Sequence, residues 1–230
     1  MRKSERFRRF LEYFLTNFPK PKTELLYTNP YELIVAVVLS AQCTDKRVNQ
    51  IMPELLNQFP TPAHLALASA EEIFPFIRSV SYPNNKAKHL AGLGRMLVED
   101  FGAEVPSSIE ELQRLPGVGR KTANVVVSVI YNQPAMAVDT HVFRVSHRLG
   151  LVSRTATTPL AVEKALVKYI PEELIPKAHH WLILHGRYIC VARQPKCNIC
   201  PLTDICEYYA KNVANNPDTP QNQPAKRLRP

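Results

Sequence analysis

The chain has 230 residues, of which 45% are hydrophobic and 21% are charged, so it can bury one large core or two smaller ones. Its 29 Lys and Arg oppose 20 Asp and Glu, and the formal net charge of +9 suits a polyanionic partner, usually nucleic acid. The longest apolar run, residues 33–39, is far too short to cross a bilayer, which argues against a membrane protein.

The first predicted element is an amphipathic helix at the N-terminus. Its apolar residues recur every three or four positions from Phe7 to Phe18, which places them on one face. The segment lacks the apolar stretch and cleavage pattern of a secretory signal, and Glu5, Glu12 and the scarcity of serine disfavour a mitochondrial transit peptide. We therefore expect an intracellular protein, in a bacterial cytoplasm or, as the alternative, in an organelle.

The rest of the chain also has helical patterns, and no stretch shows sustained alternation of apolar and polar residues, so we predict an all-α fold. Capping residues predict where helices begin. The predicted N-caps are Asn29, Thr44, Ser69 with Glu72, Asn84 or Asn85, Ser107 with Glu110, Asp139 and Thr158. From about residue 212 to 230 the chain is rich in Asn, Pro and Gln and ends in basic residues, which predicts a disordered basic tail.

A glycine-rich connection in the segment Leu115-Pro-Gly-Val-Gly-Arg-Lys-Thr-Ala123 joins two predicted helices. Gly117 and Gly119 permit positive φ and leave the backbone bare. The N–H groups of Val118, Gly119 and Arg120 are then expected to point at an anion, beside the positive end of the next helix. This pattern predicts a helix–hairpin–helix that binds a DNA phosphate without reading bases. The alternative is an ordinary helical turn.

Lys121 is predicted to lie in the first turn of the second helix, where its ammonium opposes the helix dipole. The penalty of about 0.3–1 kcal/mol is too small to make the amine nucleophilic at neutral pH, although burial could shift its pKa further. Lys121 is therefore either a phosphate-binding charge or a Schiff-base nucleophile.

Asp139 is the candidate partner of this lysine and is predicted at the start of a helix in Ala-Val-Asp-Thr-His-Val. A helix cap needs no chemistry, so the structural role alone would explain the residue. A carboxylate held charged by backbone N–H groups is also suited to stabilising positive charge, such as an oxocarbenium ion at a sugar carbon.

Four cysteines lie within 17 residues near the C-terminus, with the spacing C-x6-C-x2-C-x5-C: Cys190, Cys197, Cys200 and Cys206. Four thiolates at this spacing favour a [4Fe–4S] cluster over zinc, because zinc sites more often use two C-x2-C pairs and only one is present. Two disulfides are the remaining alternative, and no other sign of an oxidising compartment supports them. Cys43 lies in an apolar context and is expected to be a small core residue.

Three motifs occur in this order: the hairpin segment with Lys121, the Val-Asp-Thr-His-Val segment with Asp139, and the four cysteines. Together they closely resemble those of the endonuclease III family of DNA glycosylases and AP lyases, within the helix–hairpin–helix–Gly/Pro–Asp superfamily. The resemblance extends from about Arg2 to Lys211. It implies a two-domain, all-α fold that binds DNA across the cleft between the domains. The implied six-helix barrel with the hairpin covers residues 22–133, and the implied cluster domain combines residues 1–21 and 134–211.

The resemblance also implies residue roles. The family lysine and aspartate correspond to Lys121 and Asp139. Gln42 matches a glutamine that enters the gap left by a flipped nucleotide. The opposite wedge is a leucine after a glycine in close relatives, and here Tyr82 occupies that place and is followed by Pro83. Arg193 and Lys196, in the loop between the first two cysteines, become candidate phosphate contacts, although a solvated charged loop would look the same.

The implied function is a bifunctional base-excision-repair enzyme. It would act as a monomer on double-stranded DNA, remove oxidised pyrimidines and cleave the strand at abasic sites through a lysine Schiff base. One alternative is the related adenine-mismatch glycosylase, which usually lacks this lysine and has an additional C-terminal domain. Another is a non-catalytic DNA-binding module with a structural cluster, which would leave the pairing of Lys121 with Asp139 unexplained.

Overall fold

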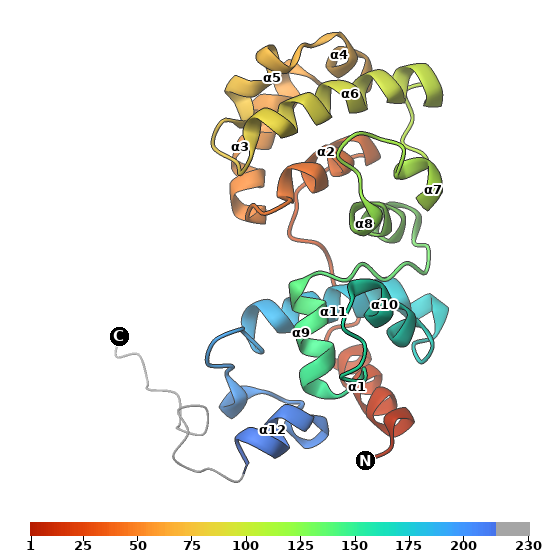
Figure 1. Ribbon diagram of the computed structural model, residues 1–230, viewed down its shortest axis with the longest axis vertical. Coiled ribbons are helices and arrows are strands. Elements are labelled where there is room, and N and C mark those ends of the chain that lie inside the picture. Colours follow the sequence, from red (N-terminus) through yellow and green to blue (C-terminus); the bar gives the residue numbers. More distant parts are fainter. Residues whose placement is uncertain (215–230) are drawn as a thin grey trace, which may run out of the picture. The chain divides into compact units, whose positions relative to one another are not determined.

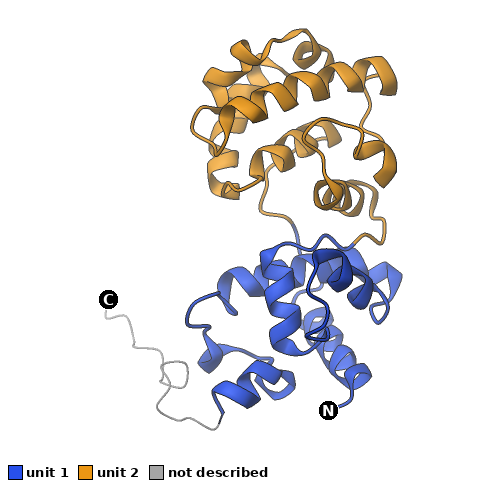
Figure 2. Ribbon diagram, viewed as in Figure 1, with its two compact units in different colours: residues 1–22, 136–230 blue, residues 23–135 orange. Residues whose placement is uncertain are grey.

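The computed structural model describes residues 1–214, and the predicted tail beyond them lies outside the described residues. Every regular element within residues 1–214 is helical, so the prediction of an all-α fold is confirmed (Figure 1). No helix in this part of the chain is long and apolar enough to cross a membrane. Two compact units are formed, which are coloured separately in Figure 2. Unit 2 is Thr23–Ala135, and unit 1 combines Met1–Lys22 with the described residues from Met136 onward.

Unit 2 is built around a helix that is apolar on every side. Its α-helices are α2 (Pro30–Ser40), α3 (Asp45–Gln58), α4 (Pro62–Leu67), α5 (Ala70–Ile77), α6 (Pro83–Phe101), α7 (Ile109–Leu112) and α8 (Arg120–Tyr131). In α2 every residue from Leu33 to Leu39 is buried, as expected for a helix in the middle of a core. Helix α2 packs against α3 and α8, while the long α6 packs along α4 and α5.

Unit 1 joins the N-terminal helix to the C-terminal part of the chain. Its elements are α1 (Lys3–Asn17), α9 (Thr140–Leu149), α10 (Pro159–Val167), η1 (Glu172–Leu174), α11 (Ile175–Tyr188), η2 (Cys197–Ile199), η3 (Thr203–Ile205) and α12 (Glu207–Asn212). Helix α9 packs against α10, α11 and α12. The ring of Phe14 in α1 stacks on Trp181 in α11, with 5.5 Å between centroids. This contact joins the N-terminal helix to a helix from the later part of the chain.

Most of the predicted helix caps are confirmed. The side chains that accept from the first turn of a helix as predicted are those of Asn29, Thr44, Ser69, Asp139 and Thr158. Ser69 and Glu72 form the predicted capping box.

Two predicted caps are wrong. The helix predicted from Ser107 begins one residue later, because the Glu111 N–H donates to Ser108 Oγ (3.1 Å). Both positions carry serine, and the sequence pattern did not distinguish them. Neither Asn84 nor Asn85 is a cap, because α6 begins at Pro83, whose fixed φ suits a first helical position. Tyr82 takes the N-cap position with a left-handed φ of 55°.

Candidate active site

The connection between α7 and α8 carries the predicted phosphate-binding backbone, with one correction. The Val118 N–H donates to Leu115 O (3.0 Å), so the prediction that this group is free is wrong. The tight turn itself uses that donor. Gly119 is exposed and its N–H has no hydrogen-bond partner among the described residues. Arg120 begins α8, where N–H groups have no acceptor within the helix. The bare backbone is therefore centred on Gly119, the N-cap of α8.

The two glycines of this connection have different physical roles. Gly117 has a φ of +81°, and a Cβ there would meet the His89 side chain at 3.0 Å. Gly119 has an ordinary extended conformation, and a Cβ there would meet nothing within 4 Å. Gly117 is thus required by the fold, whereas no contact among residues 1–214 requires a glycine at position 119. The open space above Gly119 suits a close approach by a ligand backbone.

Lys121 is the second residue of α8, and its side chain is exposed. Its primary amine lies two residues after the bare Gly119 backbone. A group bound to that backbone would therefore lie within the reach of a long, flexible side chain. The hairpin and Lys121 are thus neighbours on the surface of unit 2.

Gln42 and Tyr82, the two residues predicted to enter the duplex, also lie on unit 2. Both are exposed, Tyr82 with 62% of its surface accessible. Both have left-handed backbone conformations, with φ of 54° and 55°, which is uncommon for residues other than glycine. Gln42 follows the end of α2 and Tyr82 precedes α6, and the Ser81 Oγ donates to Gln42 O (2.6 Å). The structure therefore brings these two candidates together.

Asp139 belongs to unit 1 and caps α9. The Val142 N–H donates to its Oδ1 (2.7 Å), so the capping role is confirmed. The carboxylate is only partly buried, and Oδ2 has no hydrogen-bond partner among the described residues. The segment before it is held by the buried His179, whose Nδ1 lies 2.9 Å from Ala137 O. The cap therefore orients the carboxylate and leaves one oxygen available.

The four predicted ligand cysteines also belong to unit 1. None of them is in a disulfide, and all four line one small cavity. Burial, reinforced by the neighbouring cysteines, raises the pKa of Cys197 to about 11 and that of Cys200 to about 12. Four thiolates gathered here need a positive centre, and an iron–sulfur cluster supplies one. The donor set therefore fits a [4Fe–4S] cluster, and two disulfides are not formed.

Two arginines of α9 hold the cysteine segment, and sequence reasoning missed both. Arg148 donates to Val191 O (2.7 Å) and Ala192 O (2.8 Å), and its guanidinium lies 3.5 Å from Cys190 Sγ. Arg144 donates to Cys190 O (3.1 Å). Their spacing of four residues places them on one face of α9, a signal that was present in the sequence. The helix that begins at Asp139 is thus fastened to the cysteine segment.

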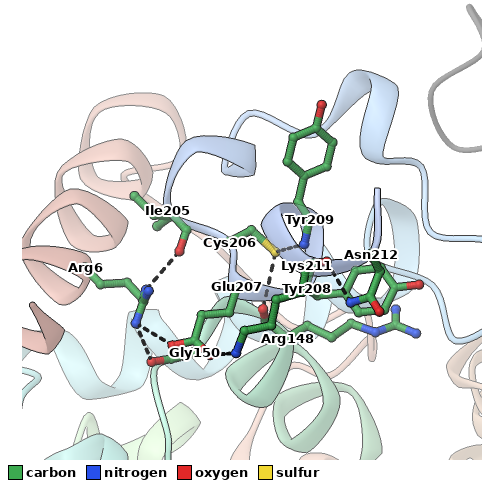
Figure 3. Close-up of polar contacts among 10 residues, drawn as sticks. All are labelled: Arg6, Arg148, Gly150, Ile205, Cys206, Glu207, Tyr208, Tyr209, Lys211 and Asn212. Carbon is green, nitrogen blue, oxygen red and sulfur yellow. Dashed lines mark hydrogen bonds and ion pairs between the residues drawn. The ribbon is translucent and has the colours of Figure 1, made fainter. Parts of the chain in front are cut away.

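The far end of the cysteine segment is fastened by the N-terminal helix (Figure 3). Arg6 is 8% exposed and donates to Ile205 O (2.8 Å), Gly150 O (3.0 Å) and Glu207 Oε1 (3.0 Å). The Cys206 Sγ lies 3.3 Å from Arg148 O, and the Tyr209 N–H donates to the same sulfur (3.4 Å). Arg6 therefore connects α1, α9 and the last ligand cysteine.

The loop between the first two cysteines presents the predicted basic residues to solvent. Arg193 and Lys196 are both exposed. The Lys196 N–H donates to Ile189 O (3.0 Å), which anchors the loop backbone after Gln194, a residue with a φ of 51°. The two side chains are thus available for phosphate, whereas the backbone between them is fixed.

Known proteins that are similar to this chain identify its family and fold. Residues 35–172 match the model of the HhH-GPD superfamily base excision DNA repair protein, and residues 190–206 match the iron–sulfur binding domain of endonuclease III. Endonuclease III of Rickettsia prowazekii is 46% identical over 207 residues, which cover 90% of this chain and 97% of the relative. Endonuclease III of Bacillus subtilis is 49% identical over 189 residues, which cover 82% and 86%.

A solved structure of a trapped endonuclease III–DNA covalent intermediate superposes with a TM-score of 0.86 at 45% identity, covering 92% of this chain and 99% of that chain. The fold, the hairpin and the cysteine segment thus define a base-excision DNA repair glycosylase with an iron–sulfur segment. The chain belongs to the endonuclease III family, whose members are bifunctional DNA glycosylases and AP lyases.

Proposed function

We propose that Lys121 is the nucleophile of this enzyme and that Asp139 stabilises the positive charge that develops on the sugar. The substrate is duplex DNA with an oxidised pyrimidine or an abasic site. The observation that carries this proposal is the exposed amine of Lys121, placed two residues after a backbone segment that is bare of side chains.

The chemistry divides into two steps. The amine of Lys121, as the free base, attacks C1′ of an extruded nucleotide, and the C1′–N bond to the base breaks. The unpaired Oδ2 of Asp139 is suited to stabilise the oxocarbenium character at C1′, because its partner oxygen is already fixed by the helix. The adduct loses an amine proton and its C1′–O4′ bond opens, with the proton going to O4′, which gives an iminium at C1′. The iminium acidifies the C2′ protons, and loss of one of them breaks the C3′–O bond and expels the 3′ phosphate.

The remaining candidates bind the DNA. The backbone at Gly119 and the start of α8 would hold a phosphate on one side of the lesion, and Arg193 with Lys196 would hold the backbone elsewhere. Gln42 and Tyr82 would fill the vacancy left by the extruded nucleotide. An iron–sulfur cluster bound by the four cysteines would hold residues 190–206 in one conformation.

The predicted domains correspond in this proposal to the two units. Unit 2 would be the hairpin-containing barrel, and unit 1 the cluster domain. We infer that the enzyme acts as a monomer on the nucleoid in a bacterial cytoplasm.

Trapping by borohydride tests the nucleophile. Reduction of the iminium should link the wild-type protein covalently to DNA that contains an abasic site, and peptide mapping should locate the link at Lys121. Lys121→Gln should abolish the link while keeping affinity for DNA with a stable tetrahydrofuran abasic analogue. An adduct that persists in Lys121→Gln, or that maps elsewhere, would overturn the assignment.

A second substitution tests the carboxylate. Asp139→Asn keeps a good helix cap, so the melting temperature should change little. The rate of base release should fall by about 100-fold or more, in the range found when one electrostatic stabiliser is removed. Unchanged incision of DNA with an oxidised pyrimidine would exclude Asp139 from the reaction and favour a purely capping role.

A further inference from the structure

Two exposed loops of unit 2 carry the residues proposed to enter the duplex, and one buried lysine touches both loops. Lys86 in α6 is only 5% exposed. Its Nζ donates to Leu39 O (2.8 Å) and Ala41 O (2.7 Å), at the end of α2 just before Gln42. Tyr82 is the N-cap of the same helix, and the Lys86 N–H makes the first helical hydrogen bond to Tyr82 O (3.1 Å), as any residue at this position would. The side chain of Lys86 thus connects the start of α6 to the end of α2.

This lysine is unusual in its environment. It lies on the apolar face of α6 that also carries Leu90, Leu93 and Leu97, all fully buried. No salt bridge to Lys86 is present within the described residues, and its ammonium donates to two backbone carbonyls. A buried ammonium without a carboxylate partner is costly, so these carbonyls must hold it. They lie at the C-terminal end of α2, where the helix dipole favours a cation.

A second bond connects the same two loops closer to their tips. The Ser81 Oγ donates to Gln42 O at 2.6 Å. Gln42 and Tyr82, which both have left-handed backbones, are thus each attached to the other loop.

We propose that Lys86 and Ser81 are positioning residues that fasten Gln42 and Tyr82 into one preformed wedge. The wedge fills the vacated position in the duplex as a unit. Two left-handed residues on separate loops would otherwise relax independently, and the DNA would have to order both on binding. This inference rests on the proposed roles of Gln42 and Tyr82, and it does not depend on Lys121 as the nucleophile.

The test uses the full-length protein and DNA with a tetrahydrofuran abasic analogue opposite 2-aminopurine, whose fluorescence rises when its stacking is lost. No bond is broken in this assay, so the result is independent of the reaction. Gln42→Ala and Tyr82→Ala should each reduce the fluorescence rise. Ser81→Ala should reduce it as well and weaken binding about two- to tenfold, the range for one hydrogen bond.

Matched controls separate positioning from stability. Ser40→Ala removes a similar bond, which Ser40 Oγ donates to Val37 O (2.8 Å) at the end of α2. That bond lies within α2 and does not join the two loops. It should leave the fluorescence and affinity unchanged. Ser81→Thr retains the hydroxyl and should restore both. Lys86→Met should reduce the fluorescence rise and the melting temperature together, and if it fails to fold, Ser81→Ala still decides.

Double-mutant cycles give the sharpest readout. In the wild-type background the affinity losses of Gln42→Ala and Tyr82→Ala should be non-additive, and in the Ser81→Ala background they should become closer to additive. Additive losses in both backgrounds, or Ser81→Ala behaving like Ser40→Ala, would overturn the inference. If neither Gln42→Ala nor Tyr82→Ala changes the fluorescence, their proposed insertion fails, and borohydride trapping at Lys121 would still stand or fall separately.

Discussion

The two glycines of the hairpin provide a direct test of the phosphate-binding backbone, because one is required by the fold and the other is not. In Gly117→Ala the alanine would have to adopt a φ of +81°, and its Cβ would lie 3.0 Å from the His89 side chain. A left-handed conformation costs an L-residue about 1–2 kcal/mol. For a chain of this size that corresponds to a melting temperature lower by about 2–8 °C.

Gly119→Val should behave in the opposite way. Its Cβ meets nothing within 4 Å and its backbone is extended, so no strain is expected. Valine is a poorer N-cap than glycine by roughly 1 kcal/mol, and the smaller entropy of the unfolded chain offsets about 0.4–1 kcal/mol of this. The melting temperature should therefore change by less than about 2 °C.

The effect of Gly119→Val on DNA affinity should be much larger. The valine side chain would keep a phosphate away from the Gly119 N–H, and a hydrogen bond to a charged group contributes about 1.5–3 kcal/mol. That corresponds to a dissociation constant higher by about 10- to 100-fold. Fluorescence anisotropy with the tetrahydrofuran analogue and thermal melting of both variants measure the two quantities. If Gly119→Val loses as much stability as Gly117→Ala and binds DNA normally, the hairpin is an ordinary turn.

Two further predictions concern charge. Replacing both Arg193 and Lys196 by Ala should weaken binding to every DNA sequence and reduce the slope of log K against log salt by up to about 1.8, because each phosphate contact contributes about 0.9; a loss confined to one lesion would contradict phosphate contact. Burial lowers the pKa of His180 to about 4 from an ordinary value of 6.5, so the unfolded chain binds more protons between these values. The stability of the protein should therefore be complete above pH 6.5 and fall as the pH decreases toward 4, by up to about 3 kcal/mol from this group. Denaturant titrations at pH 7 and pH 4.5 should show a smaller pH dependence in His180→Gln, and an unchanged dependence would place the cause elsewhere.

The elements that the sequence predicted well have local causes. The caps at Asn29 and Asp139 depend on one side chain and the backbone two or three residues later, so spacing along the chain was enough. The four cysteines were recognisable for the same reason, because their ligand spacing lies within one short segment. The glycines of the hairpin were also local, although the sequence did not show that one N–H is used by the turn itself.

The features that were missed depend on contacts between distant parts of the chain. Arg6 falls within the predicted N-terminal helix, and only the fold shows that it is the buried connection between α1 and Glu207, about 200 positions away. The sequence pattern did not single out Lys86, because a lysine on an apolar helix face has no evident local function. Its role became visible only when the fold placed it under the carbonyls at the end of α2.

The same distinction applies to the proposed mechanism. Lys121 and Asp139 are each placed by local structure, a hairpin in one case and a helix cap in the other. Contacts between distant parts of the chain fix their surroundings: Arg144 and Arg148 attach the helix of Asp139 to the cysteine segment, and Lys86 attaches α6 to the end of α2, beside the loops proposed to enter the duplex. A chemical group can therefore be recognised from its neighbours in sequence, whereas the contacts that hold its surroundings come from buried or partly buried cations that donate to carbonyls elsewhere in the fold. Substitutions at these cations should thus reduce activity through lost positioning even where the reacting groups are intact.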